Sequence, residues 1–447
     1  MAVETTSDTA GLYTRPAELL QRLLRYDTTN PPGAEGECIA FVKGLLDDAG
    51  FETTLLALDP ARPNLIARLP GAGAAPPLLL HGHVDVVTTA NQTWQQPPFE
   101  GRLQDGWIWG RGALDMKGGV AMMLSAVLRA KVEGVVPPGD VMLVVLSDEE
   151  AGSDMGAKYL VEQHADLFQG VRFAVGEGGG TTRYVDGRRF YPIMVIEKQM
   201  CWMRAVVRGP GGHGSRPMRG GTMAKLAAML DTLDRNRLPV HVPLATRRMI
   251  EEMAEVLSPE RGRDLRRLLN EGETDAVLDT LGPLGQFIEP MLHNTVNATI
   301  VSGGHKINVI PSEVVVEMDG RLLPGYTSQD MLDELGRLLG PDVELEVLRY
   351  DRGPGEPDMG LYQVMADVLR AQDPEGAPVP MLLSAVTDGR FWAQLGMQPY
   401  GFLPMQFPDS VDPVRLVHAA DERTTPEAVE FGANAIYQLI QRFGSAS

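Results

Sequence analysis

The sequence predicts an α/β protein whose mostly parallel sheet is covered by helices on its faces. Short apolar runs at 78–87, 141–147 and 173–176 have the length of buried strands, and the apolar spacing at 119–134 is that of a core helix. A strand, a helix and a further strand at this rhythm are typical of parallel sheets. The pattern changes near residue 200, where we expect a smaller α+β domain to be inserted.

The length of the chain also favours two domains. A chain of 447 residues is long for a single hydrophobic core. We predict that residues 1–199 and 351–447 form the larger domain and that residues 200–350 form the inserted one. In the inserted domain we expect strands at 201–209, 294–301, 312–323 and 343–349, helices at 221–235 and 328–339, and a charged helical stretch without strands at 246–282.

The larger domain should begin and end with helices. Residues 15–50 read as a helical segment, with Pro16 near its start and Gly50 just past its end. After the inserted domain we predict helices at 360–371 and 425–443, separated by a loop at 384–390.

Charge and composition exclude several classes of partner. The net charge of −19 argues against binding to nucleic acid or to an anionic membrane surface. No apolar run approaches the roughly 20 residues of a membrane-spanning helix, and the start of the chain does not resemble a signal peptide. Cys38 and Cys201 lie far apart in the sequence, so we expect a reducing, cytoplasmic location.

Ionisable side chains gather where the predicted strands end, which is where ligands bind in open α/β sheets. Asp115, in a glycine-rich turn before a helix, can bridge two metal ions roughly 3.5–4 Å apart, and His418 is the best candidate for a histidine ligand from elsewhere. Imidazole and carboxylate ligands together suit zinc, cobalt or manganese. The groups after the three apolar runs are His81, His83 and Asp85, then Asp148, Glu149 and Glu150, and finally Glu177.

Neighbouring positions in these motifs should have different roles. Residues two apart in an extended segment share a face, so Asp85 can accept the free ring N–H of His83 and fix its tautomer. We expect His81 to pack beneath the site instead of binding metal. Glu149 and Glu150 point in different directions, so one of them can bind metal while the other stays free to move protons.

Seven segments, in order along nearly the whole chain, resemble the dinuclear zinc aminoacylase and carboxypeptidase family. That family includes acetylornithine deacetylase, succinyl-diaminopimelate desuccinylase, glutamate carboxypeptidase and carnosinase-like dipeptidases. The resemblance implies a mostly parallel catalytic domain with a ferredoxin-like lid that also serves for dimerisation. The segments are HGHVDVV (81–87), GRGALDMKGG (110–119), SDEEAGS (147–153), GEGGG (176–180), GGHGSRP (211–217), NVIPSE (308–313) and the late His418.

The resemblance also implies a role for each matched residue in the larger domain. It makes Glu149 the general base and Asp85 the carboxylate that orients the first histidine ligand. Two divalent ions are expected, zinc before cobalt or manganese. The implied ligands are His83, Asp115 and Glu177 for one ion, and Asp115, Glu150 and His418 for the other.

The inserted domain resembles the family's lid. There His213 matches a histidine that is delivered to the partner subunit's active site to stabilise the oxyanion, which implies a homodimer. Asn308 and Arg321 match residues that hold the substrate, Arg321 preferably through a two-pronged contact with a carboxylate. Thr387 matches the family's substrate loop, but the two glycines that desuccinylases place before that loop are absent, which weakens a diaminopimelate assignment. The stretch 246–282 is longer than in compact bacterial deacylases.

Three functions remain open on the sequence. We favour an exopeptidase on short peptides, either a carboxypeptidase or a dipeptidase, and the same machinery suits an N-acyl-amino-acid deacylase. Both would hydrolyse an amide bond beside a free carboxylate through a hydroxide that bridges the two ions, with Glu149 as general base. A non-catalytic metal- or peptide-binding protein on this fold should have lost the base or a ligand, and all matched positions are present. No phosphate-cradling loop or nucleotide fingerprint supports other chemistry.

Overall fold

The computed structural model describes residues 11–353 and 355–446. The chain forms two compact units. The first comprises Met1–Val195, Pro357–Met381 and Thr387–Ser447, and the second comprises Ile196–Glu356 and Leu382–Val386. The boundaries predicted from the sequence lie at 199/200 and 350/351, and they place the segment Leu382–Val386 of the second unit in the larger domain. The assignment of one unit to catalysis and the other to a lid stays a prediction.

The first unit is built on a large mixed sheet whose centre is parallel. Strands β6 (Val141–Leu146), β3 (Leu78–His83), β7 (Phe173–Gly176) and β17 (Gln398–Gly401) lie side by side and run parallel. Their carboxyl ends therefore meet at one edge of the sheet, and this confirms the α/β class predicted from the apolar runs. The flanking strands are β1 (Thr53–Leu56), β2 (Asn64–Leu69), β9 (Arg188–Glu197), β16 (Ala377–Leu383) and β8 (Arg183–Val185).

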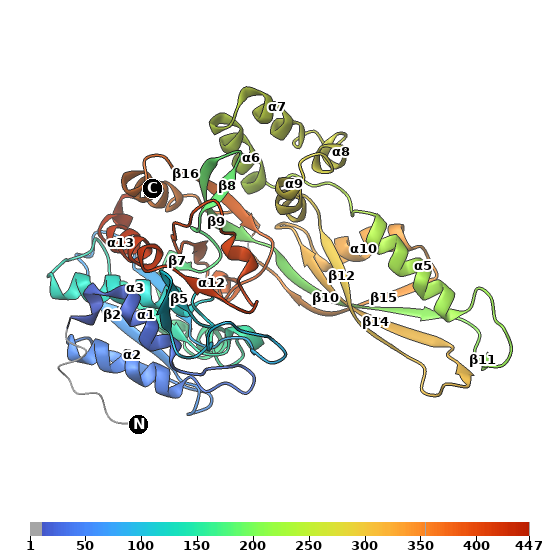
Figure 1. Cartoon of the computed structure of the whole chain (residues 1–447), viewed down its shortest axis with the longest axis horizontal. Coiled ribbons are helices and arrows are strands. Elements are labelled where there is room, and N and C mark those ends of the chain that lie inside the picture. Colours follow the sequence, from blue (N-terminus) through green and yellow to red (C-terminus); the bar gives the residue numbers. More distant parts are fainter. Residues whose placement is uncertain (1–10, 354, 447) are drawn as a thin grey trace. The chain divides into compact units, whose positions relative to one another are not determined.

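Helices cover this sheet and bury its faces (Figure 1). The most enclosed is α3 (Lys117–Val132), which packs on β3, α1 (Pro16–Leu24) and α13 (Pro426–Arg442) and is apolar on nearly every side. Side chains of β6 pack with α4 (Ala157–Gln163) and with Trp392 of α12 (Gly389–Gln394) in a buried hydrophobic cluster. The unit also contains α2 (Gly36–Asp48), α11 (Tyr362–Gln372) and a small sheet of β4 (Arg102–Gln104), β5 (Trp107–Trp109) and β18 (Arg423–Thr424).

The expected helical segment at 15–50 is interrupted, which is a correction to the sequence analysis. Helix α1 ends at Leu24 and α2 begins at Gly36. The chain has already left the helical path at Arg25, and Pro31 and Pro32, which lack the N–H that a helix needs, keep it from forming a helix again before Gly36. The freed segment instead pairs with residues after β3, where Asn30 N–H donates to the carbonyl of Val86 at 2.9 Å.

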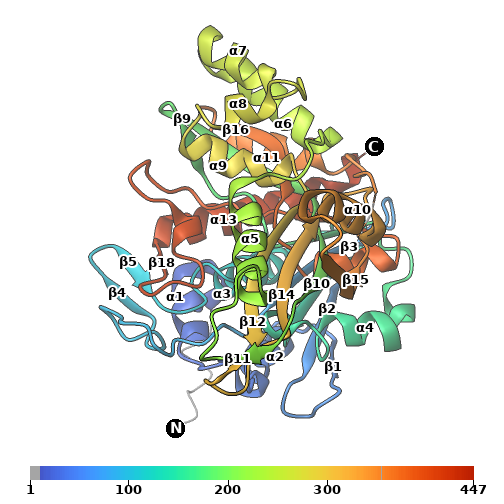
Figure 2. The same cartoon turned by 90° about the vertical axis from the view of Figure 1, so that its right-hand side faces the viewer.

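The second unit has a ferredoxin-like βαββαβ arrangement. Its antiparallel sheet has the order β12 (Thr295–Gly303), β14 (Glu313–Leu322), β10 (Gln199–Arg208) and β15 (Val343–Asp351). Helices α5 (Thr222–Arg235) and α10 (Ser328–Leu339) pack against this sheet and against each other (Figure 2). Strand β12 forms one edge of the sheet, and its residues beyond Val296 are exposed.

The stretch at 246–282 is helical, as predicted. It contains α6 (Leu244–Val256), α7 (Pro259–Arg267) and α8 (Thr274–Leu278), followed by α9 (Pro283–Ile288). Arg237, just past α5, donates from Nη2 to Asp279 at 2.8 Å and to Glu289 at 3.0 Å, which ties this helical insertion to the rest of the unit. The short elements that remain are strands β11 (Gly212–His213) and β13 (Val309–Ile310) and the 3-10 helices η1 (Leu12–Thr14), η2 (Glu149–Ala151), η3 (Ala165–Phe168), η4 (Glu289–Met291), η5 (Pro413–Arg415) and η6 (Phe443–Ser445).

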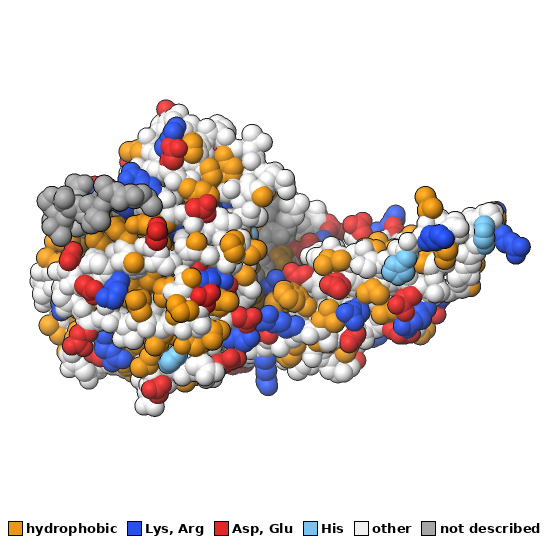
Figure 3. Space-filling view, turned by 90° about the horizontal axis from the view of Figure 1, so that it is seen from below, with side chains coloured by type: hydrophobic (Ala, Val, Ile, Leu, Met, Phe, Trp, Pro, Cys, Tyr) orange, Lys and Arg blue, Asp and Glu red, His pale blue; other side chains and the backbone are white. Residues whose placement is uncertain are grey.

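The surface carries both signs of charge despite the large net negative charge. On the face drawn in Figure 3, acidic and basic side chains are interspersed with apolar ones. Within residues 11–353 and 355–446, no helix combines the length and the apolar character that crossing a membrane requires.

Candidate metal centre

The first unit brings together the predicted metal ligands at the carboxyl edge of its parallel strands. The apolar run of each strand fills the core, and the charged residues that follow the strand emerge at the carboxyl edge of the sheet. His83 is the last residue of β3, and Glu177 directly follows β7. The others are Glu149 and Glu150 in η2 after β6, Asp115 in the turn before α3, and His418 in the loop between η5 and β18.

Asp115 lies between the two histidines and directs one carboxylate oxygen at each. Its Oδ1 is 3.3 Å from Nε2 of His83, and its Oδ2 is 3.1 Å from Nε2 of His418. On one side, Glu177 Oε2 lies 3.6 Å from the same nitrogen of His83. On the other side, Glu150 Oε1 lies 3.3 Å from that of His418. The site therefore consists of two imidazole–carboxylate groups that share Asp115.

These side chains fit a bound cation better than they fit one another. Nε2 of His83 and Oε1 of Glu150 are buried and have no hydrogen-bond partner among the described residues. Two ligands of one tetrahedral zinc ion, each about 2.0–2.1 Å from it, lie about 3.3 Å apart, which matches the separations just given. Buried polar atoms without partners are costly, and a metal ion beside each of these two atoms would satisfy them.

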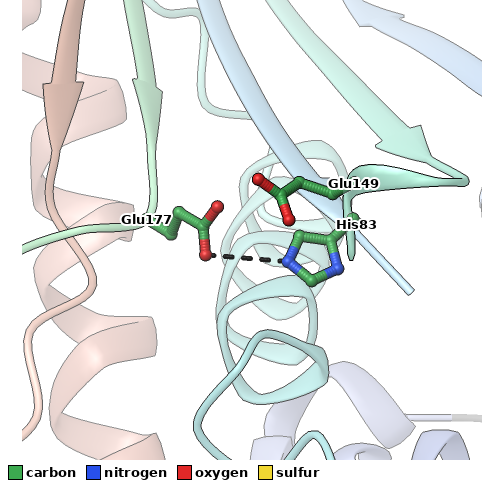
Figure 4. Close-up of side chains that lie close together, drawn as sticks. All are labelled: His83, Glu149 and Glu177. Atoms are coloured by element: carbon green, nitrogen blue, oxygen red, sulfur yellow. Dashed lines mark ion pairs between the residues drawn. The ribbon is translucent and has the colours of Figure 1, made fainter. Parts of the chain in front are cut away.

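Glu149 also reaches this cluster. Ligand atoms of His83, Glu149 and Glu177 lie within 4.8 Å of one another, as do those of His83, Asp115 and Glu150. Figure 4 shows the Glu149 carboxylate beside the His83 ring, facing Glu177. Because Glu149 does not approach His418 as Glu150 does, the adjacent glutamates occupy different places in the site, as predicted.

Mutual electrostatic interactions shift the protonation of these groups. Burial, followed by the charge of Glu177, raises the pKa of Glu149 well above its usual range. Burial, and then the charge of Asp115, raises the pKa of Glu177 to about 8. The carboxylates of Asp115 and Glu150 raise the pKa of His418 to about 10. Carboxylates crowded in this way compete for protons, and a divalent cation relieves their repulsion.

Asp85 lies against the ring nitrogen of His83 that points away from Asp115. Its Oδ1 lies 3.3 Å from Nδ1 of His83, and its backbone oxygen is 3.0 Å from the same nitrogen. With oxygen acceptors on this side, Nδ1 carries the proton and the lone pair of Nε2 faces Asp115. His81 instead is buried beneath the site beside Trp392, and burial lowers its pKa to about 3, in agreement with a packing role.

Glu422 and Arg111 hold the Asp115 turn and the His418 loop together, and the sequence analysis missed both. The Glu422 carboxylate is fully buried and accepts hydrogen bonds from the backbone N–H of Leu114 at 2.8 Å and of Asp115 at 3.1 Å. Arg111 donates to Glu422 at 2.6 Å and to the carbonyl of His418 at 3.2 Å. The available signal was the position of Arg111 in the motif GRGALD and of Glu422 four residues after His418.

Replacing Glu422 with alanine should destabilise the metal-free protein by about 3–5 kcal/mol. The substitution removes one partner of a buried ion pair and leaves Arg111 without its carboxylate. Urea unfolding of the apo form measures the change without any contribution from metal binding. The control is Asp367→Ala, whose pair with Arg370 is exposed and should change stability by about 0–1 kcal/mol. Equal effects of the two substitutions would show that the Glu422 network is not a structural support.

Two of the predicted lid residues lie next to each other in the second unit. His213 in β11 pairs with Val309 of β13, and the N–H of Gly214 donates to the carbonyl of Asn308 at 2.9 Å. The N–H of Ser215 donates to Nδ1 of His213 at 3.2 Å, so the ring proton belongs on Nε2. His213 is exposed and thus presents an N–H donor. The structure gives no side-chain hydrogen bond for Asn308.

Arg321 and Thr387 are already engaged within the protein. Arg321 donates from Nε and Nη2 to the two oxygens of Asp319 at 2.8 and 3.0 Å, so the expected two-pronged contact with a substrate would have to displace Asp319. Nη1 of Arg321 is buried without a hydrogen-bond partner among the described residues, and it is the donor left for a ligand. Thr387 is buried, and its hydroxyl accepts from the N–H of Gly389 at 3.0 Å.

Comparisons with known proteins identify the family and the fold. The sequence profile of Peptidase family M20/M25/M40 matches residues 79–442. The probable carboxypeptidase S-like 2 of Dictyostelium discoideum is 27% identical over 385 residues, covering 82% of this chain and 71% of the relative. Aminoacylase-1 of Sus scrofa is 25% identical over 440 residues, covering 96% and 95%. Human carnosine dipeptidase 1 superposes with a TM-score of 0.67 at 15% identity, covering 98% of each chain, which shows a shared fold.

Proposed function

Because the chain belongs to peptidase family M20/M25/M40, we propose that it is a two-zinc exopeptidase that cleaves short peptides beside a free carboxylate. The family membership makes the chain a metal-dependent hydrolase of peptide or N-acyl amide bonds. The number of ions, their identity and the class of substrate are the proposed part. The observation that carries the proposal is the position of Asp115, with one carboxylate oxygen toward each of two histidines.

The proposed ligands divide into two sets that share Asp115. His83 and Glu177 complete the first set, and Glu150 and His418 complete the second. Three protein ligands at each ion leave a coordination position open, as catalytic zinc requires. When bound, such a pair of ions polarises the scissile carbonyl and brings the pKa of a water molecule toward neutrality. Cobalt and manganese share this preference for nitrogen and oxygen ligands.

Glu149 is the proposed general base. Its carboxylate reaches the cluster, and Nη1 of Arg390 lies 4.0 Å from its Oε1. The backbone N–H of Glu149 donates to Asp85 at 3.1 Å, which fixes the turn that carries the side chain. Glu149 takes the proton of the attacking water and returns it to the nitrogen of the leaving amine. The N–H of His213 is the proposed donor to the oxyanion, and Asn308 is proposed to bind the polar groups of the substrate.

An N-acyl-amino-acid deacylase is the second candidate. A relative that matches nearly the whole chain is named aminoacylase-1, and this observation supports the removal of an acyl group. Both reactions break an amide bond next to a carboxylate and use the same ligands and base. A non-catalytic binding protein is the remote alternative, and the complete set of proposed ligands argues against it. We further propose a cytoplasmic homodimer formed through the second unit, whose edge strand β12 is exposed.

A substrate screen tests the proposal directly. Dipeptides and carboxy-terminal tripeptides are compared with N-acetyl, N-succinyl and N-fatty-acyl amino acids, each with zinc or cobalt added. Turnover of the peptides at the higher kcat/KM supports the exopeptidase, and turnover of the acyl amino acids supports the deacylase. If the zinc-loaded protein hydrolysed none of these carboxylate substrates, the result would contradict both the exopeptidase and the deacylase.

Replacing Arg321 with methionine should raise KM for carboxylate substrates by about 10- to 100-fold, with a smaller change in kcat. A charge-assisted hydrogen bond to a substrate is worth about 1.5–3 kcal/mol, and it is absent when the carboxylate is amidated. The matched control is Arg349→Met, because Arg349 donates from Nε and Nη2 to Asp351 in β15, just as Arg321 donates to Asp319 in β14. An equal loss with amidated substrates, or with the control variant, would argue against carboxylate recognition.

A further inference from the structure

The segment before α2 runs beside the strand end that carries His83. Thr28 donates from its hydroxyl to the carbonyl of Val84 at 2.5 Å, and the N–H of Val86 donates to the carbonyl of Thr28 at 3.1 Å. Asn30 follows and is 4% exposed, so its side chain lies inside the protein. Neither the proposed ligand sets nor the base includes this segment.

The Asn30 amide joins two buried carboxylates that follow neighbouring parallel strands. Its Nδ2 donates to Oδ2 of Asp85 at 2.8 Å and to Oδ1 of Asp148 at 3.0 Å. Asp85 follows β3 and Asp148 follows β6, and these strands pair directly. A primary amide carries two N–H donors, so each carboxylate receives one. Because the amide is neutral, it donates to both carboxylates without adding a charge.

Both carboxylates in turn hold the residues that form the site. Asp85 contacts Nδ1 of His83 and accepts from the backbone N–H groups of Glu149 and Glu150, each at 3.1 Å. Asp148 adopts a positive φ of 71° and accepts from the N–H of Met155 at 3.0 Å, which closes the turn after β6. The Asn30 amide therefore joins Asp85, which contacts both His83 and the backbone of the paired glutamates, to Asp148, which closes the turn that carries those glutamates.

A buried arginine balances the charge behind this link. Nη2 of Arg62 lies 3.0 Å from Oδ1 of Asp148 and donates to Glu35 at 2.6 Å. Glu35 is fully buried, and Arg62 is 6% exposed. The guanidinium of Arg62 thus faces the carboxylates of Asp148 and Glu35. Asp85 is joined to Asp148 through the Asn30 amide. Neutral donors such as the Asn30 amide are needed to keep Asp85 and Asp148 close without further charge.

We propose that Asn30 is a positioning residue that sets the affinity of both metal positions. By holding Asp85 and Asp148 together, it keeps the imidazole of His83 and the backbone of Glu149 and Glu150 at the spacing that the ligand sets require. The inference rests on the proposed metal centre, but it concerns binding and does not depend on which substrate is cleaved. Loss of an outer hydrogen-bond partner of a metal ligand typically lowers metal affinity or activity by about 10- to 100-fold.

The test measures zinc binding to the full chain by competition with a chromophoric chelator. Asn30→Asp replaces the shared donor with an oxygen close to two other carboxylates, and Asn30→Ala removes the donor without adding charge. We expect zinc affinity to fall by about 10- to 100-fold in Asn30→Asp and by less in Asn30→Ala, with kcat reduced more than KM changes. Circular dichroism of the apo proteins verifies that each variant is folded.

Asn294→Asp is the matched control. Asn294 is equally buried in the second unit, where its amide donates to Glu334 at 3.0 Å and its oxygen accepts from the N–H of Leu323 at 2.8 Å. This variant should lose stability but bind zinc within about twofold of the unmodified protein, since it removes an amide–carboxylate bond outside the proposed ligand sets. Unchanged zinc affinity in both Asn30 variants overturns the inference, as does an equal loss in the control. A parent chain that binds no zinc would instead refute the proposed metal centre.

Discussion

Replacing Glu149 with alanine is expected to leave both metal ions bound and to lower kcat by about 100- to 10,000-fold. A positioned general base contributes a factor of this size, and the proposed ligand sets do not need Glu149. Burial and the charge of Glu177 raise the pKa of this carboxyl, so without metal it holds its proton to a higher pH than an exposed glutamate. Elemental analysis of the purified variant gives the metal content, and steady-state kinetics on the best substrate gives kcat.

The neighbouring glutamate is the natural control for this prediction. Glu150→Ala should lose the ion that Glu150 shares with His418, since the two side chains lie 3.3 Å apart. The pair of variants therefore separates a base from a ligand on adjacent residues. If Glu149→Ala lost an ion, Glu149 would instead belong with His83 and Glu177 as a ligand, an arrangement whose atoms also lie within 4.8 Å of one another.

Replacing Asp115 with alanine should remove both ions and reduce hydrolysis to the uncatalysed background. Among the described residues, Asp115 is the carboxylate with one oxygen near each histidine, at 3.3 Å from His83 and 3.1 Å from His418. Each proposed ligand set falls to two residues without it, fewer than a catalytic zinc site uses. Metal content and turnover are measured together, and dialysis of the unmodified protein against a chelator should give the same loss, reversed by zinc.

His418→Ala provides the comparison for a ligand that belongs to one ion only. It should keep the ion held by His83, Asp115 and Glu177 and release the other, so the metal content should fall by about half. Two ions retained at full occupancy in Asp115→Ala would contradict the bridging role and favour two independent sites.

The order of elements and most of the candidate metal ligands could be predicted from local sequence pattern. Apolar runs of strand length fill a buried sheet whatever surrounds them, so the strands ending at His83, Leu146 and Gly176 were predictable. Because carboxyl ends of parallel strands share one edge, the charged residues after them were expected to meet. The segment at 15–50 was predicted less well, since helical spacing on both sides obscured the break between Leu24 and Gly36.

Supporting residues could not be predicted from local pattern, because their partners are far away in the chain. Glu422 meets the N–H groups of Leu114 and Asp115, and Asn30 meets Asp148, across separations that leave no periodic signal. Arg321 is a different case, because its partner is close in the sequence. Its position suggested a free guanidinium, whereas Asp319, two residues earlier on the same face of the strand, occupies two of its donors.

The sequence by itself predicted which groups would carry the chemistry, since strand ends, a glycine-rich turn, a late histidine and the family resemblance indicated candidate ligands without knowledge of distances. The tertiary structure alone decided how those groups are held, through the buried contacts of Asn30, Arg62, Arg111 and Glu422. The physical reason is the range of the interactions. Burial of a strand is dictated by its own residues, whereas a buried hydrogen bond requires a partner that only the folded chain brings near.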